Sequence, residues 1–185
     1  MTLGPRGKLA LILGGFALPI IASFVVYAFV RPAPTANYGE LLLPPESITR
    51  STFTRASGGP FRFQDLAGRW VLLASDATAC GEACRAKLTA MRQVRLALGK
   101  ESDRVAMVTV VEGEGFVEGG LQSQHPAMAF VRPQAPLPPS SATADRGHIY
   151  LIDPLGNVMM RWPVQPEFKR MKGDLDRLLK ASQIG

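Results

Sequence analysis

Cys80 and Cys84 are the only two cysteines in this chain of 185 residues, and three residues separate them. If they stand on a helix, positions i and i+4 share one face and their Cβ atoms lie about 5–6 Å apart. Two thiolates at that distance can bind one soft metal ion. They can also form a disulfide after a small adjustment, because bridged cysteines have Cβ atoms about 3.5–4.5 Å apart. We expect the pair to be the working site, as a metal ligand or a redox couple, with a structural disulfide as the alternative.

The elements predicted around the pair are suited to positioning reactive thiols. Residues 70–74 are apolar on both faces, which predicts a buried strand of a largely parallel sheet. Residues 80–98 carry apolar side chains at helical spacing, and Gly99 can end that helix. The pair is therefore predicted at the start of a helix. There the positive end of the helix dipole stabilises the thiolate, which is the form that binds metals and attacks disulfides.

The rest of the chain beyond residue 50 completes a recognisable order of elements. The β-prone run at 104–111 predicts a second strand after the helix. Proline-rich residues 133–139 predict a loop, and 112–124 have no clear pattern. The other predicted elements are a short hairpin of 53–55 and 61–63, a strand at 127–131, a hairpin of 148–154 and 158–162, and a helix at 166–179. This order predicts a thioredoxin-like α/β fold, with a central mixed sheet flanked by helices.

The N-terminal region has the composition of a membrane segment. Residues 9–30 contain no charged side chain, and a helix of that length crosses a hydrocarbon core of roughly 30 Å. The run is longer than the apolar part of a cleaved signal peptide, so we expect an uncleaved anchor. Arg6 and Lys8 precede it, which predicts a cytoplasmic N-terminus and, in a bacterium, a periplasmic domain held by the inner membrane. The predicted boundaries are 1–8 for the cytoplasmic N-terminus, 9–30 for the transmembrane helix, 31–50 for a proline-rich linker and 51–185 for the domain.

The charge of the chain is modest and excludes one class of partner. The formal net charge is +6, and the predicted domain has no basic cluster interleaved with aromatic residues. Such clusters are typical of proteins that bind nucleic acids. We therefore expect a mixed, solvated surface and no nucleic-acid partner.

Three motifs together resemble the Sco/SenC family, membrane-anchored thioredoxin-like proteins that handle copper during cytochrome c oxidase assembly. The turn Gly68-Arg69-Trp70 leads through the apolar strand to Thr78-Ala79-Cys80-Gly81-Glu82-Ala83-Cys84, which is similar to the family's Thr-x-Cys-x-x-x-Cys motif. The stretch Tyr150-Leu151-Ile152-Asp153-Pro154-Leu155-Gly156 is similar to the family's hairpin. The single anchor and the proline-rich tether also agree with the family.

The resemblance implies a copper site on Cys80 and Cys84 with a histidine as third ligand. Copper(I) is soft and prefers thiolate and imidazole, so His148 is our candidate, with His125 as the second choice. Asp145 occupies the place of the family's histidine, and a carboxylate suits copper(I) poorly. Two other places depart from the family, because Gly81 and Arg85 stand where it has prolines after the cysteines.

The functional interpretation keeps three alternatives. The leading one is a metallochaperone rather than an enzyme, which delivers copper to the copper-binding subunit of cytochrome c oxidase. The second is a thiol–disulfide reductase that keeps the cysteines of that subunit reduced, and the third is a scaffold that uses neither thiol. Peroxiredoxin-like catalysis requires a threonine three residues before the reactive cysteine, where this chain has Ala77 and Gly81.

Overall fold

The computed structural model describes residues 4–29, 37–48, 52–113, 119–138 and 141–182. They belong to two units, Met1–Ala36 and Asn37–Gly185, which we describe separately.

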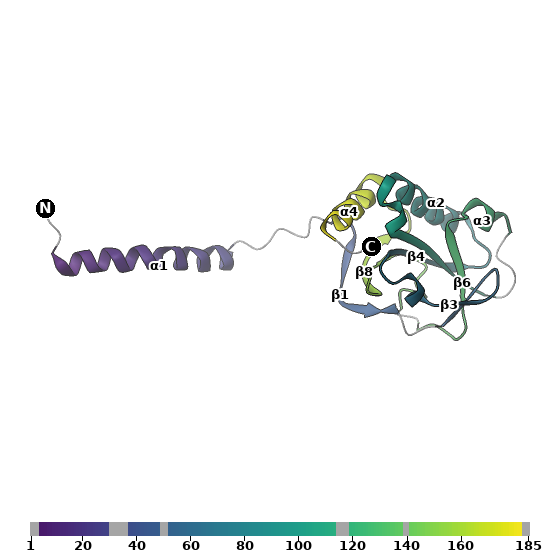
Figure 1. Ribbon diagram of the computed structural model, residues 1–185, viewed down its shortest axis with the longest axis horizontal. Helices are drawn as coiled ribbons and strands as arrows, with labels where there is room; N and C mark the ends of the chain where they lie inside the picture. Colours follow the sequence, from purple (N-terminus) through teal and green to yellow (C-terminus); the bar gives the residue numbers. More distant parts are fainter. Residues whose placement is uncertain (1–3, 30–36, 49–51, 114–118, 139–140, 183–185) are drawn as a thin grey trace. The chain divides into compact units, whose positions relative to one another are not determined.

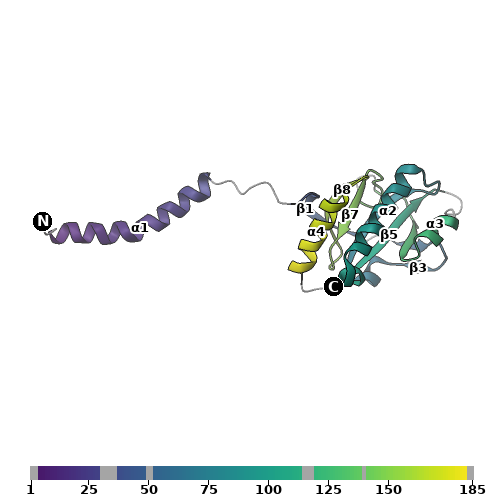
Figure 2. The same ribbon diagram turned by 90° about the horizontal axis from the view of Figure 1, so that it is seen from above.

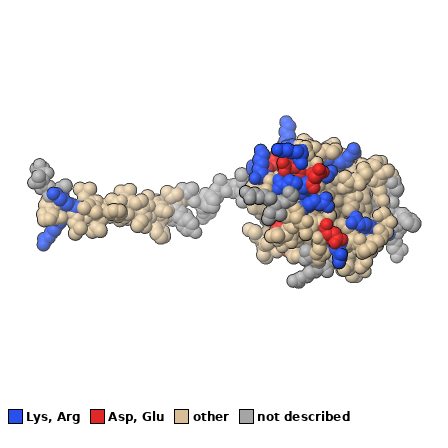
Figure 3. Space-filling model, in the orientation of Figure 1, with Lys and Arg blue, Asp and Glu red and all other residues tan. Residues whose placement is uncertain are grey.

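The first unit contains the long apolar helix α1, Pro5–Phe29. Within it, Pro5–Val26 is long and apolar enough to cross a membrane, a property that membrane anchors and signal sequences share. At about 1.5 Å per residue, this stretch spans a hydrocarbon core of roughly 30 Å. The helix begins four residues before the predicted start, so it includes the cationic Arg6 and Lys8 (Figure 3).

The second unit is built on one mixed sheet. Among the described residues, eight strands are hydrogen-bonded in the order β1-β8-β7-β4-β5-β6-β2-β3 (Figure 1). The strands are β1 (Glu40–Ser47), β2 (Phe53–Arg55), β3 (Pro60–Phe61), β4 (Trp70–Ala77), β5 (Val105–Glu112), β6 (Met128–Pro133), β7 (His148–Ile152) and β8 (Asn157–Pro163). The helices of this unit are α2 (Glu82–Ala97), α3 (Gly119–Gln124) and α4 (Phe168–Ala181), with short 3-10 turns η2 (Phe63–Leu66) and η3 (Gly99–Arg104).

Strand β4 lies in the middle of this sheet and carries the chain into the cysteine pair. It is parallel to β5, with Val71 opposite Ala106, and antiparallel to β7, with Ala74 opposite Ile149. Residues 70–75 of β4 are buried. A strand covered on both faces reads as a continuous apolar run, as the sequence does here. The predicted thioredoxin-like fold and the two predicted hairpins are confirmed.

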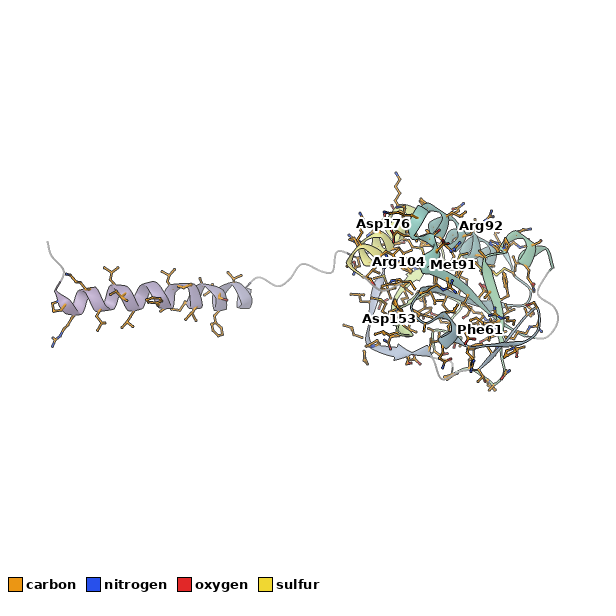
Figure 4. All side chains as sticks on the ribbon, viewed as in Figure 1. Phe61, Met91, Arg92, Arg104, Asp153 and Asp176 are labelled. Atoms are coloured by element: carbon orange, nitrogen blue, oxygen red, sulfur yellow. A yellow bond between two sulfur atoms is a disulfide. The ribbon has the colours of Figure 1, made fainter. Side chains whose placement is uncertain are left out.

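Alternating side chains divide the core between the two faces of the sheet. Leu72 and its neighbours pack beneath α2 and α4 on one face, and Leu73 packs on the other face. Figure 2 shows α2 and α4 on the same side of the strands. Helix α2 follows the predicted pattern, since Met91 is buried and the adjacent Arg92 is exposed (Figure 4).

The N-terminal edge of the sheet differs from the prediction. We expected a linker across 31–50, but Glu40–Ser47 forms β1, an antiparallel partner of β8. Its register shifts between Leu41 and Glu46, where Pro44 and Pro45 lie. Proline is tolerated in edge strands because one side of such a strand needs no ladder donors. The local sequence therefore has the composition of a linker, and only pairing with β8 makes it a strand.

Candidate metal and redox site

The two cysteines lie where β4 passes into α2. Strand β4 ends at Ala77, Cys80 lies in the following loop, and Cys84 lies in the first turn of α2. The predicted helix start at residue 80 is therefore two residues early. In the structure the two cysteines form a disulfide, with their Cα atoms 5.2 Å apart. The pair is thus placed so that both sulfurs can act together.

Burial limits access to the pair. Cys80 is 3% exposed and Cys84 is 4% exposed, and both belong to the apolar cluster beneath α2. The neighbouring loop residues Ala79 and Gly81 are exposed. Little of either cysteine is therefore accessible to a thiol reagent or a metal donor while the loop before α2 keeps this conformation.

Backbone and side-chain hydrogen bonds hold that loop in place. The Thr78 N–H donates to the carbonyl of Glu112 at the end of β5, at 3.1 Å. The Arg85 guanidinium donates from Nε to the Cys80 carbonyl, also at 3.1 Å. Arg85, which stands where the resemblance expects proline, is therefore a contact of the cysteine loop.

Lys87 is a member of the site that the sequence analysis missed. Its side chain has no exposed surface, and Nζ donates to the carbonyls of Ser75 at 2.7 Å and Arg146 at 2.9 Å. Nζ also forms an ion pair with the Asp76 carboxylate at 3.0 Å. Helical spacing could have indicated that Lys87 is buried, because it lies three residues after Cys84 on the apolar face of the helix.

His148 has a carboxylate partner in the structure. Its Nδ1 lies 2.6 Å from Oδ2 of Asp145, and the Tyr150 hydroxyl donates to the same oxygen at 2.5 Å. Because an ionised carboxylate can only accept, Nδ1 carries the proton and Nε2 is the ring nitrogen left for other ligands. A carboxylate that holds a histidine in this way fixes the tautomer of the ring.

Two pKa values in this cluster are displaced from their ordinary values. Burial would raise the pKa of Asp145, but hydrogen bonds from Tyr150, Gly147 and His148 lower it overall. Burial and the hydrogen bond to Asp145 raise the pKa of Tyr150 to about 12. Asp145 is therefore a stable anion at neutral pH.

The strand geometry places His148 on the opposite face of the sheet from the cluster that contains the cysteines. Along β7, Ile149 packs in the cluster that contains the cysteines, and Tyr150 packs in the cluster on the other face. Because side chains alternate along a strand, His148 shares the face of Tyr150, whose ring centroid is 6.1 Å from its own. No group of three or more His, Cys, Asp or Glu side chains that could hold one metal ion occurs in the described parts of the chain. Ligation by His148 therefore remains a prediction.

His125 lies in a different environment. It follows α3, is 5% exposed, and its Nδ1 has no hydrogen-bond partner among the described residues. Burial lowers its pKa, and the positive charge of Arg92 on α2 lowers it further. His125 is therefore a buried imidazole that is neutral at pH 7, with Arg92 of α2 near enough to act on its charge.

An open pocket of about 1060 Å³ lies beside the cysteine loop. Its walls come from the ends of β5 and β6 and from the segment before β7, and include Glu112, Gln134, Asp145 and Arg146. Thr78 is hydrogen-bonded to Glu112, so the pocket and the cysteine loop share one wall. Any partner that fills this pocket also lies next to the loop.

The sequence of the domain matches a known protein family. The sequence model of the family described as "Transmembrane-like, thioredoxin-like, C-terminal domain" matches residues 70–182. No curated protein matches the sequence.

Solved structures of Sco proteins share the fold at low sequence identity. Copper-bound ScoI from Bradyrhizobium japonicum is 19% identical with a TM-score of 0.54, and the match covers 69% of this chain and 96% of that one. Copper-bound Sco1 from yeast is 14% identical with a TM-score of 0.57, covering 79% and 90%. BsSco, in which a disulfide switch was identified, is 13% identical with a TM-score of 0.52, covering 74% and 98%. The predicted resemblance to Sco/SenC proteins is therefore confirmed at the level of the fold.

Proposed function

Because this chain belongs to the family of transmembrane-like, thioredoxin-like C-terminal domains, we propose that it works through Cys80 and Cys84 as a membrane-anchored assembly factor that delivers copper to cytochrome c oxidase. One observation supports this most strongly. The two cysteines are bridged, and they lie where β4 passes into α2, in a fold shared with copper-bound Sco structures.

The pair has to be reduced before it can bind copper. A thiol reductant supplies two electrons, the S–S bond breaks, and two cysteine thiols form. As thiolates, Cys80 and Cys84 offer the soft ligands that copper(I) prefers. Transfer to a target then proceeds by exchange of these thiolates for the cysteines of the oxidase subunit. Copper is the cargo in this sequence of steps.

We keep His148 as the third ligand in this proposal. Its Nδ1 is held by Asp145, which leaves Nε2 to bind a metal and orients the ring. His148 is on the other face of β7 from the buried sulfurs, so copper binding would require the cysteine loop to move toward the end of the sheet. The same movement would expose the sulfurs.

A thiol–disulfide reductase is the second candidate, because the pair is closed as a disulfide in the structure. In that role the reduced pair would transfer two electrons to a disulfide of the oxidase subunit. If the reduction potential of the Cys80–Cys84 pair is too high for it to reduce that disulfide, this role is excluded.

The location we propose is the bacterial inner membrane, with α1 as an uncleaved anchor. The cationic residues before the apolar stretch favour a cytoplasmic N-terminus and a periplasmic domain. That side of the membrane is where a copper-binding subunit of the oxidase would meet the cysteine pair.

A competition titration tests the copper proposal. The full chain, reduced and held in a mild detergent, is titrated with copper(I) against a coloured copper(I) chelator. We expect one tightly bound copper per chain, and a loss of more than about 100-fold in affinity on Cys80→Ser or Cys84→Ser, because these are direct ligands and even supporting residues cost 10–100-fold. Affinity unchanged by both substitutions would sink the proposal.

The two histidines provide a matched comparison in the same titration. His148→Ala should weaken copper(I) binding, whereas His125→Ala, which removes a buried ring near Arg92, should leave it unchanged. Equal affinities for wild type and His148→Ala would remove His148 from the ligand set.

A further inference from the structure

Lys87 is a fully buried cation on α2, three residues after Cys84. Its ammonium group has three N–H bonds, and three acceptors receive them: the Ser75 carbonyl, the Arg146 carbonyl and the Asp76 carboxylate. A buried charge is tolerated only when it is paired and fully hydrogen-bonded, and Lys87 meets both conditions. The Asp76 side chain, 19% exposed, supplies the opposite charge.

These contacts join the segments that carry the functional residues. Ser75 and Asp76 lie near the end of β4, just before the cysteine loop, and Arg146 belongs to the segment between Asp145 and β7. Lys87 itself follows Cys84 by three positions, so the two side chains are neighbours on α2 with Cβ atoms about 5–6 Å apart. Both are buried on the same side of the helix. The ammonium and the Cys84 sulfur therefore lie in one water-poor region, where a charge acts strongly on its neighbours.

We propose that Lys87 and Asp76 are positioning residues whose opposite charges set how readily the Cys80–Cys84 disulfide is reduced. This inference rests on the proposed function, in which the pair must be reduced before it acts. It assigns a role to two residues that the copper ligand set does not include.

The exchange reaction determines in which direction each charge shifts the equilibrium for reduction of the disulfide. A glutathione thiolate attacks one sulfur of the disulfide and forms a mixed disulfide, and the other cysteine sulfur departs with the electron pair of the broken bond. A second glutathione thiolate attacks the mixed disulfide, releases glutathione disulfide and leaves both cysteines reduced. Negative charge develops on cysteine sulfur in each step. The Lys87 cation favours that charge, and the Asp76 carboxylate opposes it.

The test equilibrates the full chain in mild detergent with mixtures of reduced and oxidised glutathione. The reduced fraction is then read by alkylation and mass spectrometry. Lys87→Met should lower the equilibrium constant for reduction by about tenfold, equivalent to about 30 mV for a two-electron couple. Asp76→Asn should raise the same constant, and the double variant should lie between the two. Arg92→Met, which removes an exposed cation from the same helix, should leave it unchanged.

Opposite shifts are the result that a purely structural role does not produce. If both single variants shift the constant in the same direction, or neither shifts it, the inference is overturned. Should Lys87→Met fail to fold, Asp76→Asn decides alone, because it keeps both carbonyl contacts of Lys87; an unchanged or lowered constant then overturns the inference.

The glutathione experiment can fail or succeed independently of the copper titration that tests the proposed function. The glutathione equilibrium involves neither copper nor an oxidase subunit. Weak copper binding would overturn the proposed function and leave the charge effect standing, and an unshifted equilibrium would do the reverse.

Discussion

Asp174 has no exposed surface, and its carboxylate organises the corner where the chain enters the domain. It accepts hydrogen bonds from the backbone N–H groups of Tyr38 and Gly39 and from Nε1 of Trp162, at 2.8 to 3.0 Å. Arg177 adds a charged contact at 2.6 Å. One buried carboxylate therefore joins the residues before β1 to β8 and α4.

Replacing Asp174 by alanine should destabilise the domain by about 3–5 kcal/mol, because it leaves several buried donors without their charged acceptor. Urea unfolding of the full chain in mild detergent measures the change. Asp176→Ala is the matched control on the same helix. Asp176 is half-buried and pairs with Lys172 four residues away, so its loss should cost about 0.5 kcal/mol or less. Equal losses for the two variants would contradict this account of the corner.

Asp174 also predicts how stability depends on pH. Burial would raise its pKa, but the hydrogen bonds from Trp162, Gly39, Tyr38 and Arg177 lower it below the ordinary value of 3.8. A group with a lowered pKa in the folded state contributes stability above its unfolded pKa and loses it as the pH falls through the folded pKa. The stability difference between wild type and Asp174→Asn should therefore be complete at pH 7 and shrink below about pH 4. Urea midpoints across that range check it, and a constant difference would refute it.

Single residues show what the sequence can and cannot reveal about the site. Cys80 and Cys84 were identifiable because two lone cysteines after a buried strand are rare enough to be informative. Lys87 was not, because lysine is almost always exposed and its partners include carbonyls from distant segments. A hydrogen bond from His148 to the nearby loop was an open alternative to metal binding, but no local pattern identified Asp145 as its partner.

At the scale of elements, α2, α4 and the central strands followed from periodicity, whereas α3 and the edge strand β1 did not. Residues 70–74 and 104–111 read as buried strands and form the cores of β4 and β5. Strand β1 contains two prolines and exposed side chains, so its local pattern resembles a linker. Its pairing depends on β8, more than a hundred residues later, and on the corner held by Asp174. Such long-range pairing leaves no local signal.

Replacement of glycine by alanine should stabilise the domain at one position and destabilise it at another. Gly173 lies inside α4 with open space around its added Cβ, so Gly173→Ala should stabilise the domain by about 0.5–1 kcal/mol. Gly68 also has open space, but its φ is +85°, so Gly68→Ala should cost about 1–2 kcal/mol. Urea unfolding compares them, and shifts of the same sign would be inconsistent with these conformations.

At the scale of the whole molecule, composition separated the apolar N-terminal segment from the domain. The structure divides the chain at Ala36, within the predicted linker, and its first unit contains the long apolar helix. The overall order of elements was sufficient for the thioredoxin-like fold. The sequence could not show that the disulfide is buried, because burial depends on how α2 packs on the sheet.

Expression of the full chain in a bacterium tests the anchor. We expect a protein of 20.0 kDa that stays in the membrane fraction after an alkaline wash, because an apolar helix of this length inserts stably. Protease added to spheroplasts should digest the domain, since it should face the periplasm. A shorter chain in the soluble fraction, lacking the apolar segment, would show instead that the segment is a cleaved signal.

The central claim is that the Cys80–Cys84 pair is the copper site. The reduced and oxidised states of the pair test this claim without changing any residue. The wild-type chain is divided into a reduced sample and an oxidised sample, and both are titrated with copper(I) against the same chelator under anaerobic conditions. The account predicts one tightly bound copper in the reduced chain and none in the oxidised chain, whose sulfurs are bonded to each other. Equal binding by the two samples would contradict it.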